Sequence, residues 1–242
     1  DAAIWGWASP GATVKVSTSW NRASYSTKAD ADGKWRLTVK TPVAGEVPTT
    51  VWDMSEDGSV AAQQSVKTAS GHGPFTITIS DGKPVTISNV LIGEVWLCSG
   101  QSNMEMPMKG FKDQPILGSN DAIFNSTNEH IRLYTVPRSV QRLPQDTSKQ
   151  SYWKQAEPEA VSNFSATAYY FGKMLFERLH VPIGLVNISY GGSPVEAFMD
   201  AATLKAFPEI NVPSPTDTGK LNNKNATVLY NGMLRPFLGY TI

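Results

Sequence analysis

The stretch Val90-Leu91-Ile92-Gly93-Glu94-Val95-Trp96-Leu97-Cys98-Ser99-Gly100-Gln101-Ser102-Asn103-Met104 decides the fold of this chain. Its first part is a nearly continuous apolar run, which is typical of a strand buried on both faces of a sheet. Gly100 ends the run, and Ser102 follows directly in the turn. A serine at this place lies over the carboxyl edge of an open α/β sheet, where ligands bind. It becomes an activated nucleophile if a histidine takes its proton.

The composition is that of a globular protein with room for one large domain or two smaller ones. Hydrophobic residues make up 40% of the 242 residues and charged residues 17%, which is not the composition of a disordered chain. Basic and acidic residues both number 21, so the net charge is zero and no nucleic-acid partner is expected. No apolar run approaches the ~20 residues of a membrane-spanning helix, so no membrane span is predicted.

The single cysteine, Cys98, lies inside the apolar run and is predicted to be a small buried hydrophobic residue. One cysteine excludes an intrachain disulfide and a multi-cysteine metal site. The sequence has no cluster of His, Cys and carboxylate residues with metal-ligand spacing, and no glycine-rich phosphate loop. No metal and no cofactor is therefore expected. The chain opens on strand-like residues without a signal peptide, and both of its ends look cut.

Residues 1–89 are predicted to form a β-sandwich region. Strands with period-two alternation are expected at 13–18, 34–39 and 75–79, with turn residues between them. Short alternating strands at this spacing are typical of a small β-sandwich. The segment 47–73 interrupts the pattern, and it is either a further hairpin or a long exposed loop.

Residues 90–242 change to strands that alternate with helices, which is the pattern of an α/β domain. A strand is predicted at 131–136, and a near-continuous apolar strand at 183–188. Between them, a helix is predicted to start after a cap at Ser162 or Ser165 and to end near His180. The apolar positions of this helix fit a 3.6-residue period, and they are Ala168, Phe171, Met174, Leu175 and Leu179. Strand, helix and strand in this order predict a right-handed crossover.

Two polar segments, 107–130 and 137–160, are rich in Pro, Ser, Asn, Asp and Gln. They are predicted to be long loops over the active edge rather than regular elements. Loops in this place shape the choice of substrate, but their residues do not name one.

Several stretches together resemble the sialate O-acetylesterase family, which belongs to the SGNH-hydrolase superfamily of carbohydrate acetylesterases. Residues 93–106, which contain Gly100-Gln101-Ser102-Asn103-Met104, resemble its nucleophile block, and this block is long and specific. The other matching stretches are 4–8 with 31–35, 181–187 with 191–198, and 229–237. The resemblance covers nearly the whole chain except 47–73, which looks like an insertion.

The resemblance implies an N-terminal portion of such an esterase: a β-sandwich region followed by an incomplete flavodoxin-like, three-layer α/β/α SGNH-hydrolase domain. It implies a serine esterase that removes O-acetyl groups from a carbohydrate, with 9-O-acetylated sialic acid as the leading substrate. Acetylxylan or another acetylated glycan is the alternative within the enzyme class. A non-catalytic glycan-binding fragment is the alternative outside it. Family members act mostly outside the cytoplasm, so a periplasmic or secreted location is expected.

The resemblance also implies roles for three residues. Ser102 would attack the acetyl carbonyl and form an acetyl-enzyme. Its backbone N–H and an N–H from Gly191 or Gly192 would donate to the oxyanion, with Gly192 favoured although the sequence does not separate the two. Losing one such donor typically costs roughly 10²–10³ in rate. Independently of the family, two glycines after a strand expose bare backbone amides to a ligand.

Four further residues are candidate substrate contacts, each with a structural alternative. Gln101 and Asn103 flank the nucleophile, and their side chains are also suited to tie the turn to neighbouring backbone. Glu196 is either a substrate contact or a solvated carboxylate near a helix start. Asn231 lies where the family approaches its active edge, and it is a candidate ligand contact.

The family's third-block Asn and its late Asp-x-x-His are not found in this sequence. His72, His130 and His180 are poor substitutes, because their predicted places are a turn of the β region, the end of a polar loop and a helix C-terminus. The base is therefore expected from sequence beyond residue 242 or from a second polypeptide. The chain alone is expected to be nearly inactive and prone to aggregate, since a sheet without its later strands exposes an edge.

Overall fold

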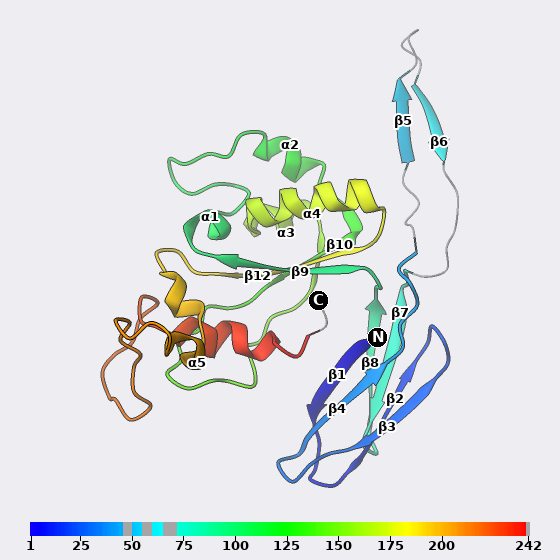
Figure 1. Ribbon diagram of the computed structural model, residues 1–242. Coiled ribbons are helices and arrows are strands. Elements are labelled where there is room, and N and C mark those ends of the chain that lie inside the picture. Colours follow the sequence, from blue (N-terminus) through cyan, green and yellow to red (C-terminus); the bar gives the residue numbers. More distant parts are fainter. Residues whose placement is uncertain (46–49, 55–59, 65–71, 241–242) are drawn as a thin grey trace. The chain divides into compact units, whose positions relative to one another are not determined.

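The computed structural model of the chain is a mixed α/β structure with several sheets and few helices (Figure 1). It describes residues 1–45, 50–54, 60–64 and 72–240. Within these ranges, no helix is long and apolar enough to cross a membrane. At this coarse level the α/β class predicted from the sequence is confirmed.

The chain divides into two compact units. The first comprises Asp1–Glu94 and Leu175–Ile183, and the second comprises Val95–Met174 and Gly184–Tyr240. The domains predicted from the sequence, 1–89 and 90–242, stay a prediction, because the first unit also takes in a segment from the later region.

Two antiparallel sheets form most of the first unit. Their strands are β1 Ala2–Trp7, β2 Thr13–Thr18, β3 Ser24–Lys28, β4 Lys34–Val39, β7 Phe75–Ser80 and β8 Pro84–Val90. The larger sheet has the order β3-β2-β7-β8, and the smaller pairs β1 with β4. The strands predicted at 13–18, 34–39 and 75–79 are all present, and the last is one residue longer than predicted.

The two sheets share one hydrophobic core. Burial alternates along β2, so that Val14 and Val16 are buried while Lys15 is exposed. Trp35 and Val39 of β4 belong to the same buried cluster. Because every second side chain of a strand points to the same face, the alternation seen in the sequence places one face of each sheet in this core.

A separate hairpin lies within the segment 47–73. It pairs β5 Thr50–Met54 with β6 Val60–Gln64 in antiparallel register. Of the two alternatives for this segment, the structure thus contains the hairpin. The remainder, 47–49, 55–59 and 65–71, lies outside the described residues, as do 241–242, and the interpretation of 47–73 as an insertion stays a prediction.

A four-stranded sheet forms the centre of the α/β region. Its strands are β9 Glu94–Gly100, β10 Asn128–Thr135, β11 Lys154–Ala156 and β12 Ile183–Ser189, in the order β11-β10-β12-β9. All seven residues of β12 are buried, as predicted for a near-continuous apolar strand. The strand predicted at 131–136 is present as β10, which starts earlier.

The strands β9 and β12 run parallel. Glu94 N–H at the start of β9 donates to Pro182 O just before β12 (2.9 Å), and Tyr190 N–H just after β12 donates to Gly100 O (3.1 Å). Among the described strands, β9 lies at an edge of this sheet. The carboxyl ends of β9 and β12 therefore meet at the same place, where ligands bind in parallel sheets.

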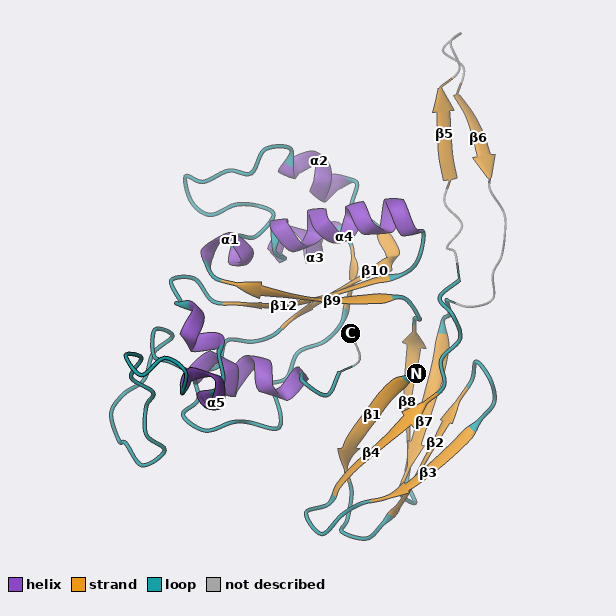
Figure 2. Cartoon of the chain, in the orientation of Figure 1, coloured by secondary structure: helices purple, strands orange, loops and turns teal. Residues whose placement is uncertain are grey.

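Helices lie on both faces of this sheet (Figure 2). On one face are α3 Pro158–Asn163 and α4 Ala166–Leu179, which connect β11 to β12. On the other face lie the short helices η1 Val195–Phe198, α5 Ala201–Leu204, η2 Tyr230–Leu234 and η3 Arg235–Phe237. A buried cluster joins Val186 and Ile188 of β12 to Leu229 and Met233 around η2, so β12 packs against this side.

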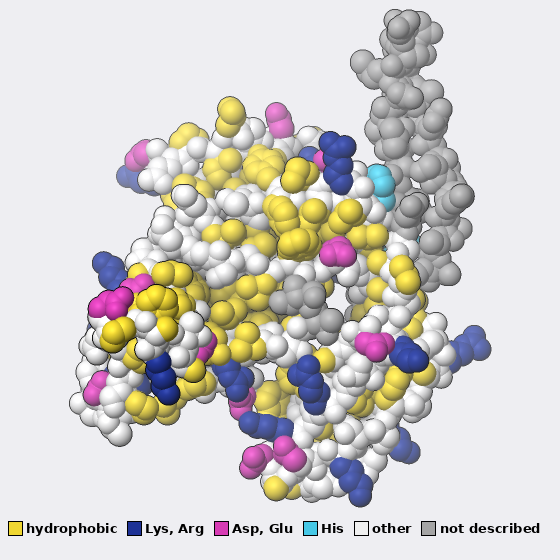
Figure 3. Space-filling model, in the orientation of Figure 1, with side chains coloured by type: hydrophobic (Ala, Val, Ile, Leu, Met, Phe, Trp, Pro, Cys, Tyr) yellow, Lys and Arg dark blue, Asp and Glu magenta, His cyan; other side chains and the backbone are white. Residues whose placement is uncertain are grey.

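The helix predicted after Ser165 is α4, and Ser165 is its cap, because Ser165 Oγ accepts from Ala168 N–H (3.1 Å). Of its predicted apolar positions, Ala168 is buried and Phe171 and Leu175 are partly buried, whereas Met174 and Leu179 are exposed, at 53% and 45%. Hydrophobic side chains gather over this helix in the space-filling view (Figure 3). The buried face is rotated toward Gly172, where an added Cβ would lie 2.5 Å from the Leu185 side chain. The close packing of α4 on β12, and not the apolar periodicity of its sequence, thus decides which face of the helix is buried.

The expectation that 107–130 and 137–160 lack regular elements is wrong in part. The first contains α2 Ser119–Phe124 and the start of β10, and the second contains β11 and the start of α3. The helices α2 and α3 have six residues each, fewer than two turns, and β11 has three, so none of them is long enough to show its period in the sequence.

Candidate active site

The turn after β9 places Ser102 at the carboxyl edge of the sheet. Gly100 is the last residue of β9, and Ser102 is the first residue of the short helix α1 Ser102–Glu105. A Cβ at Gly100 would lie 3.1 Å from Met104 Cβ, so the absence of a side chain allows α1 to begin directly behind the strand. The Ser102 side chain is exposed.

One oxygen atom joins the predicted nucleophile to a predicted oxyanion donor. Ser102 Oγ donates to Gln101 Oε1 at 3.0 Å, and Gly192 N–H donates to the same oxygen at 3.2 Å. Gln101 and Gly192 are both exposed. The structure thus brings Ser102, Gln101 and Gly192 together around a carbonyl-type oxygen that solvent and ligands can reach.

The neighbouring amide has a different partner. Gly191 N–H donates to Glu105 Oε2 at 2.9 Å, and Glu105 Oε1 pairs with Arg138 Nη2. The Glu105 side chain is only 17% exposed. A Cβ at Gly191 would lie 2.5 Å from Glu105 Oε2, so a side chain here would displace the carboxylate from its contact with the backbone amide.

Two further contacts hold the turn after β12. The Arg138 guanidinium lies 4.5 Å from the centre of the Tyr190 ring, a cation–π geometry. On the other side, Asn223 Nδ2 donates to Gly191 O (2.9 Å) and to Ser193 Oγ (3.1 Å). Contacts from both sides therefore fix the backbone that presents the two glycine amides.

A cavity of about 270 Å³ opens beside this turn. It is lined by the end of β9, by Gln101 in the turn that follows, and by the segment after Gly192, namely Ser99, Gly100, Gln101, Ser193, Pro194, Val195 and Phe198. The apolar lining, Pro194, Val195 and Phe198, comes from the segment after Gly192. Gln101, which accepts from Ser102 Oγ, belongs to the polar lining.

Two candidate substrate contacts, Asn103 and Glu196, lie near the turn, and each accepts a hydrogen bond through its backbone carbonyl. The Asn103 carbonyl accepts from Thr167 Oγ1 at 3.0 Å, which fastens α1 to α4. The Glu196 carbonyl in η1 accepts from Thr227 N–H at 2.9 Å. Their roles as substrate contacts stay predictions.

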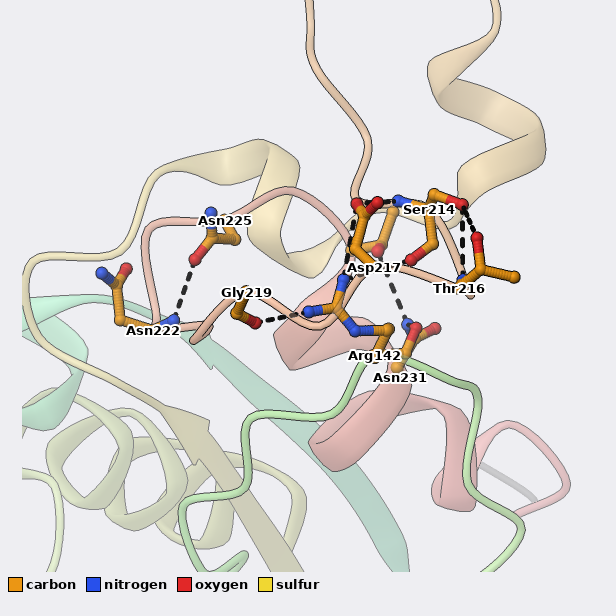
Figure 4. Close-up of polar contacts among 9 residues, drawn as sticks. Arg142, Ser214, Thr216, Asp217, Gly219, Asn222, Asn225 and Asn231 are labelled. Atoms are coloured by element: carbon orange, nitrogen blue, oxygen red, sulfur yellow. Dashed lines mark hydrogen bonds and ion pairs between the residues drawn. The ribbon is translucent and has the colours of Figure 1, made fainter.

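Asn231 is placed in a buried polar cluster rather than at the cavity. It is 5% exposed, and its Nδ2 donates to Gln141 O (3.2 Å) and Arg142 O (2.9 Å). The Arg142 guanidinium in turn donates to the carbonyls of Ser214 (3.1 Å) and Gly219 (2.6 Å), as Figure 4 shows. These contacts describe a structural role for Asn231, and its role as a ligand contact stays a prediction without support from its geometry.

The thiol of Cys98, four residues before Ser102, is buried within β9. Desolvation raises the pKa of its thiol from 9.0 to about 11. A thiol with so high a pKa is a poor nucleophile near neutral pH, as predicted for a buried structural cysteine. In the part of the chain that the structure describes, no group of three or more His, Cys, Asp or Glu residues is placed to hold a metal ion.

The sequence did not single out Glu105, Arg138 or Asn223. Glu105 lies inside the nucleophile block, three residues after Ser102, so its position on α1 was a usable signal. Arg138 is 33 residues away from Glu105 in the chain and lies in a polar segment without a motif. Only the fold brings it to the site.

Comparisons with known proteins agree on the family. No protein-family model matches the chain. The sialate O-acetylesterase of Pongo abelii is 31% identical over the whole chain, and that of Homo sapiens is 30% identical over the whole chain. The chain covers 43% of either relative, so it spans less than half of their length.

A solved structure gives the same result. A carbohydrate acetylesterase from Xanthomonas citri is similar with a TM-score of 0.76 and 30% identity over 99% of this chain and 45% of that one. The α/β fold is therefore that of a carbohydrate acetylesterase. The chain belongs to the sialate O-acetylesterase family. Each relative contains its matching region within one longer chain, so the comparisons give no support to the expected second polypeptide.

Proposed function

We propose that the protein is a serine esterase that removes O-acetyl groups from a carbohydrate, with Ser102 as the nucleophile. The observation that carries the proposal is the convergence of Ser102 Oγ and Gly192 N–H on one oxygen, Gln101 Oε1, beside a cavity. A substrate carbonyl oxygen is chemically similar to this carboxamide oxygen. The names of the relatives support the reaction class.

In the proposed reaction, Ser102 Oγ attacks the acetyl carbonyl carbon while its proton passes to a general base. The carbonyl oxygen becomes an oxyanion, and the backbone N–H groups of Ser102 and Gly192 donate to it. The sugar oxygen then takes a proton and leaves, and water releases acetate from the acetyl-enzyme. In the described residues, Ser102 Oγ donates to Gln101 and not to a histidine, so the base is the part of the mechanism that remains to be located.

We further propose the finer features that the family resemblance implies. These are a flavodoxin-like SGNH-hydrolase arrangement in the α/β region, a β-sandwich in the first unit, and a periplasmic or secreted location. The parallel pair β9 and β12 with helices on both faces supports the first of them. The shared core of the two antiparallel sheets supports the second. Acetylated sialic acid is the leading substrate, because the curated relatives are named for it.

The test combines a substrate panel with one substitution. Acetate release is measured on 9-O-acetylated sialic acid, acetylxylan and a simple aryl acetate, for the native chain, for Ser102→Ala and for the exposed control Ser24→Ala. The chain alone is expected to be nearly inactive, so the comparison uses its residual rate. Ser102→Ala should remove that rate, because the nucleophile is lost, and Ser24→Ala should leave it unchanged. A fluorophosphonate probe should label the native chain at Ser102.

Each alternative has its own outcome. Glycan binding that survives Ser102→Ala in a chain without hydrolysis would identify a binding fragment. Faster release from acetylxylan than from the sialic acid would reassign the substrate. Hydrolysis that is unchanged in Ser102→Ala would overturn the nucleophile.

A further inference from the structure

The two glycine amides after β12 differ in what holds them. Gly191 N–H binds a carboxylate that is largely buried and ion-paired, whereas Gly192 N–H binds an exposed neutral carboxamide. Hydrogen bonds to an ionised acceptor are about twice as strong as those between neutral groups. The Gly191 amide is therefore committed to Glu105, and the Gly192 amide is free to exchange Gln101 for a ligand.

Space around the two glycines shows the same difference. An added Cβ at Gly191 would meet Glu105 Oε2 at 2.5 Å, while nothing lies within 4 Å of the corresponding position at Gly192. Gly192 also has a positive φ of 73°, a conformation that L side chains rarely adopt. The side-chain position of Gly191 thus meets the Glu105 carboxylate, whereas that of Gly192 faces open space.

Arg138 extends this arrangement to the end of β12. Its guanidinium pairs with Glu105 and lies over the Tyr190 ring, and Tyr190 N–H donates to Gly100 O. The Arg138 backbone carbonyl accepts from Lys149 Nζ at 2.9 Å. The carboxylate therefore receives a fixed cation on one side and a backbone amide on the other, and it joins α1 to the turn after β12.

We propose that Glu105 and Arg138 are positioning residues, which bind the Gly191 amide and thereby present the Gly192 amide as the oxyanion donor next to Ser102. The proposal rests on the proposed function, and it assigns the donor that the sequence left open between two glycines. Glu105 and Arg138 do not touch the reacting atoms. They act through the backbone that they hold.

Binding of acetate identifies the donor amide without any turnover, because a carboxylate oxygen can accept a hydrogen bond from that amide. In the ¹⁵N-labelled chain, sodium acetate should move the amide resonance of Gly192 and leave that of Gly191 unchanged, with sodium chloride at equal ionic strength as the control. A shift of Gly191 alone, or of neither glycine, would overturn the assignment.

Substitution of the carboxylate tests the positioning role. In Glu105→Ala, the Gly191 amide should lose its protection from hydrogen exchange by about tenfold or more, since its acceptor is gone. Glu105→Gln keeps an oxygen acceptor and should restore part of the protection. Arg138→Met should give an intermediate loss, and Glu209→Ala, an exposed carboxylate on a loop, should give none. Full protection of Gly191 in Glu105→Ala would disprove the role, and circular dichroism shows whether that variant is folded.

Kinetics separate this inference from the proposed function. If Ser102 is the nucleophile, Glu105→Ala should lower kcat about tenfold with KM little changed, because a displaced donor weakens binding of the transition state rather than of the substrate. An unchanged kcat with lost protection would show that the contact is only structural and would overturn the inference. Hydrolysis that survives Ser102→Ala contradicts the proposed function instead, and the two amide measurements then decide this inference alone. The same two measurements decide it if the native chain, as expected without its base, turns over too slowly to assay.

Discussion

Two polar clusters in the α/β region have similar residue types and different purposes. At the nucleophile turn, Ser102 and Gly192 both donate to the exposed side chain of Gln101. In the cluster of Figure 4, Asn231 and Arg142 donate to backbone carbonyls, and the Arg142 side chain is only 16% exposed. Donors of the first cluster can exchange their acceptor for a ligand, and donors of the second cannot without breaking the fold. The donors Ser102 and Gly192 are exposed and the donors Asn231 and Arg142 are largely buried, so accessibility of the donor, more than the polarity of the residues, marks the candidate site.

The largest expected effect is on the alkylation rate of Cys98, which is buried in β9 just before the exposed turn that carries Ser102. With a pKa of about 11 instead of 9.0, Cys98 should react with iodoacetamide at pH 8 about 100-fold more slowly than a model thiol, because the thiolate is the reactive form. Alkylation is followed by intact mass with glutathione as the reference. Rapid alkylation in the folded chain would show that the Cys98 thiol is accessible. The contrast between a buried Cys98 and an exposed Ser102 would then be wrong.

The same raised pKa has a consequence for stability. Since the charged thiolate is disfavoured in the folded chain, Cys98 should reduce stability only as pH rises above its unfolded pKa near 9. Cys98→Ser should remove this part of the pH dependence between about pH 9 and 11, measured by urea unfolding. The same alkaline slope in both proteins would contradict the assignment to Cys98.

A smaller effect is expected from Asn231→Ala in the buried cluster. The change leaves two backbone carbonyls without their donor, which should cost about 1–3 kcal/mol of unfolding free energy. Substrate KM should stay unchanged, and the exposed Asn120→Ala should affect neither quantity. A raised KM with full stability would place Asn231 in the substrate site after all.

The smallest effect is expected from Gln101→Ala at the exposed turn. Removing the carboxamide frees the Gly192 amide from a competing acceptor, so acetate should bind about 2- to 5-fold more tightly, in line with the net value of one hydrogen bond. Calorimetric titration with sodium acetate measures this change, and the exposed Gln150→Ala serves as the control. Weaker acetate binding would instead make Gln101 a direct contact of the ligand.

Local patterns in the sequence were enough to predict the main elements of the sheets. The alternation in 13–18, 34–39 and 75–79, and the apolar run at 183–188, each depend on neighbours within one strand, and the structure contains all four. The face of α4 was predicted less well. Its orientation is set by the close approach of Gly172 to Leu185, a contact that no periodicity within the helix contains.

What the sequence determined by itself is the strand–turn–serine unit that ends in Ser102, the family, and a pair of glycines suited to expose amides. The strand–turn–serine unit and the glycine pair are each encoded by residues close together in the chain. Only the tertiary structure decided which amide is available, because the Glu105 carboxylate that takes Gly191 N–H comes from a residue 86 positions away. The structural role of Asn231 was likewise decided by the tertiary structure, because its Nδ2 donates to carbonyls 90 and 89 positions earlier in the chain. A hydrogen bond between distant segments depends on how the sheet brings them together, and that is a property of the whole fold.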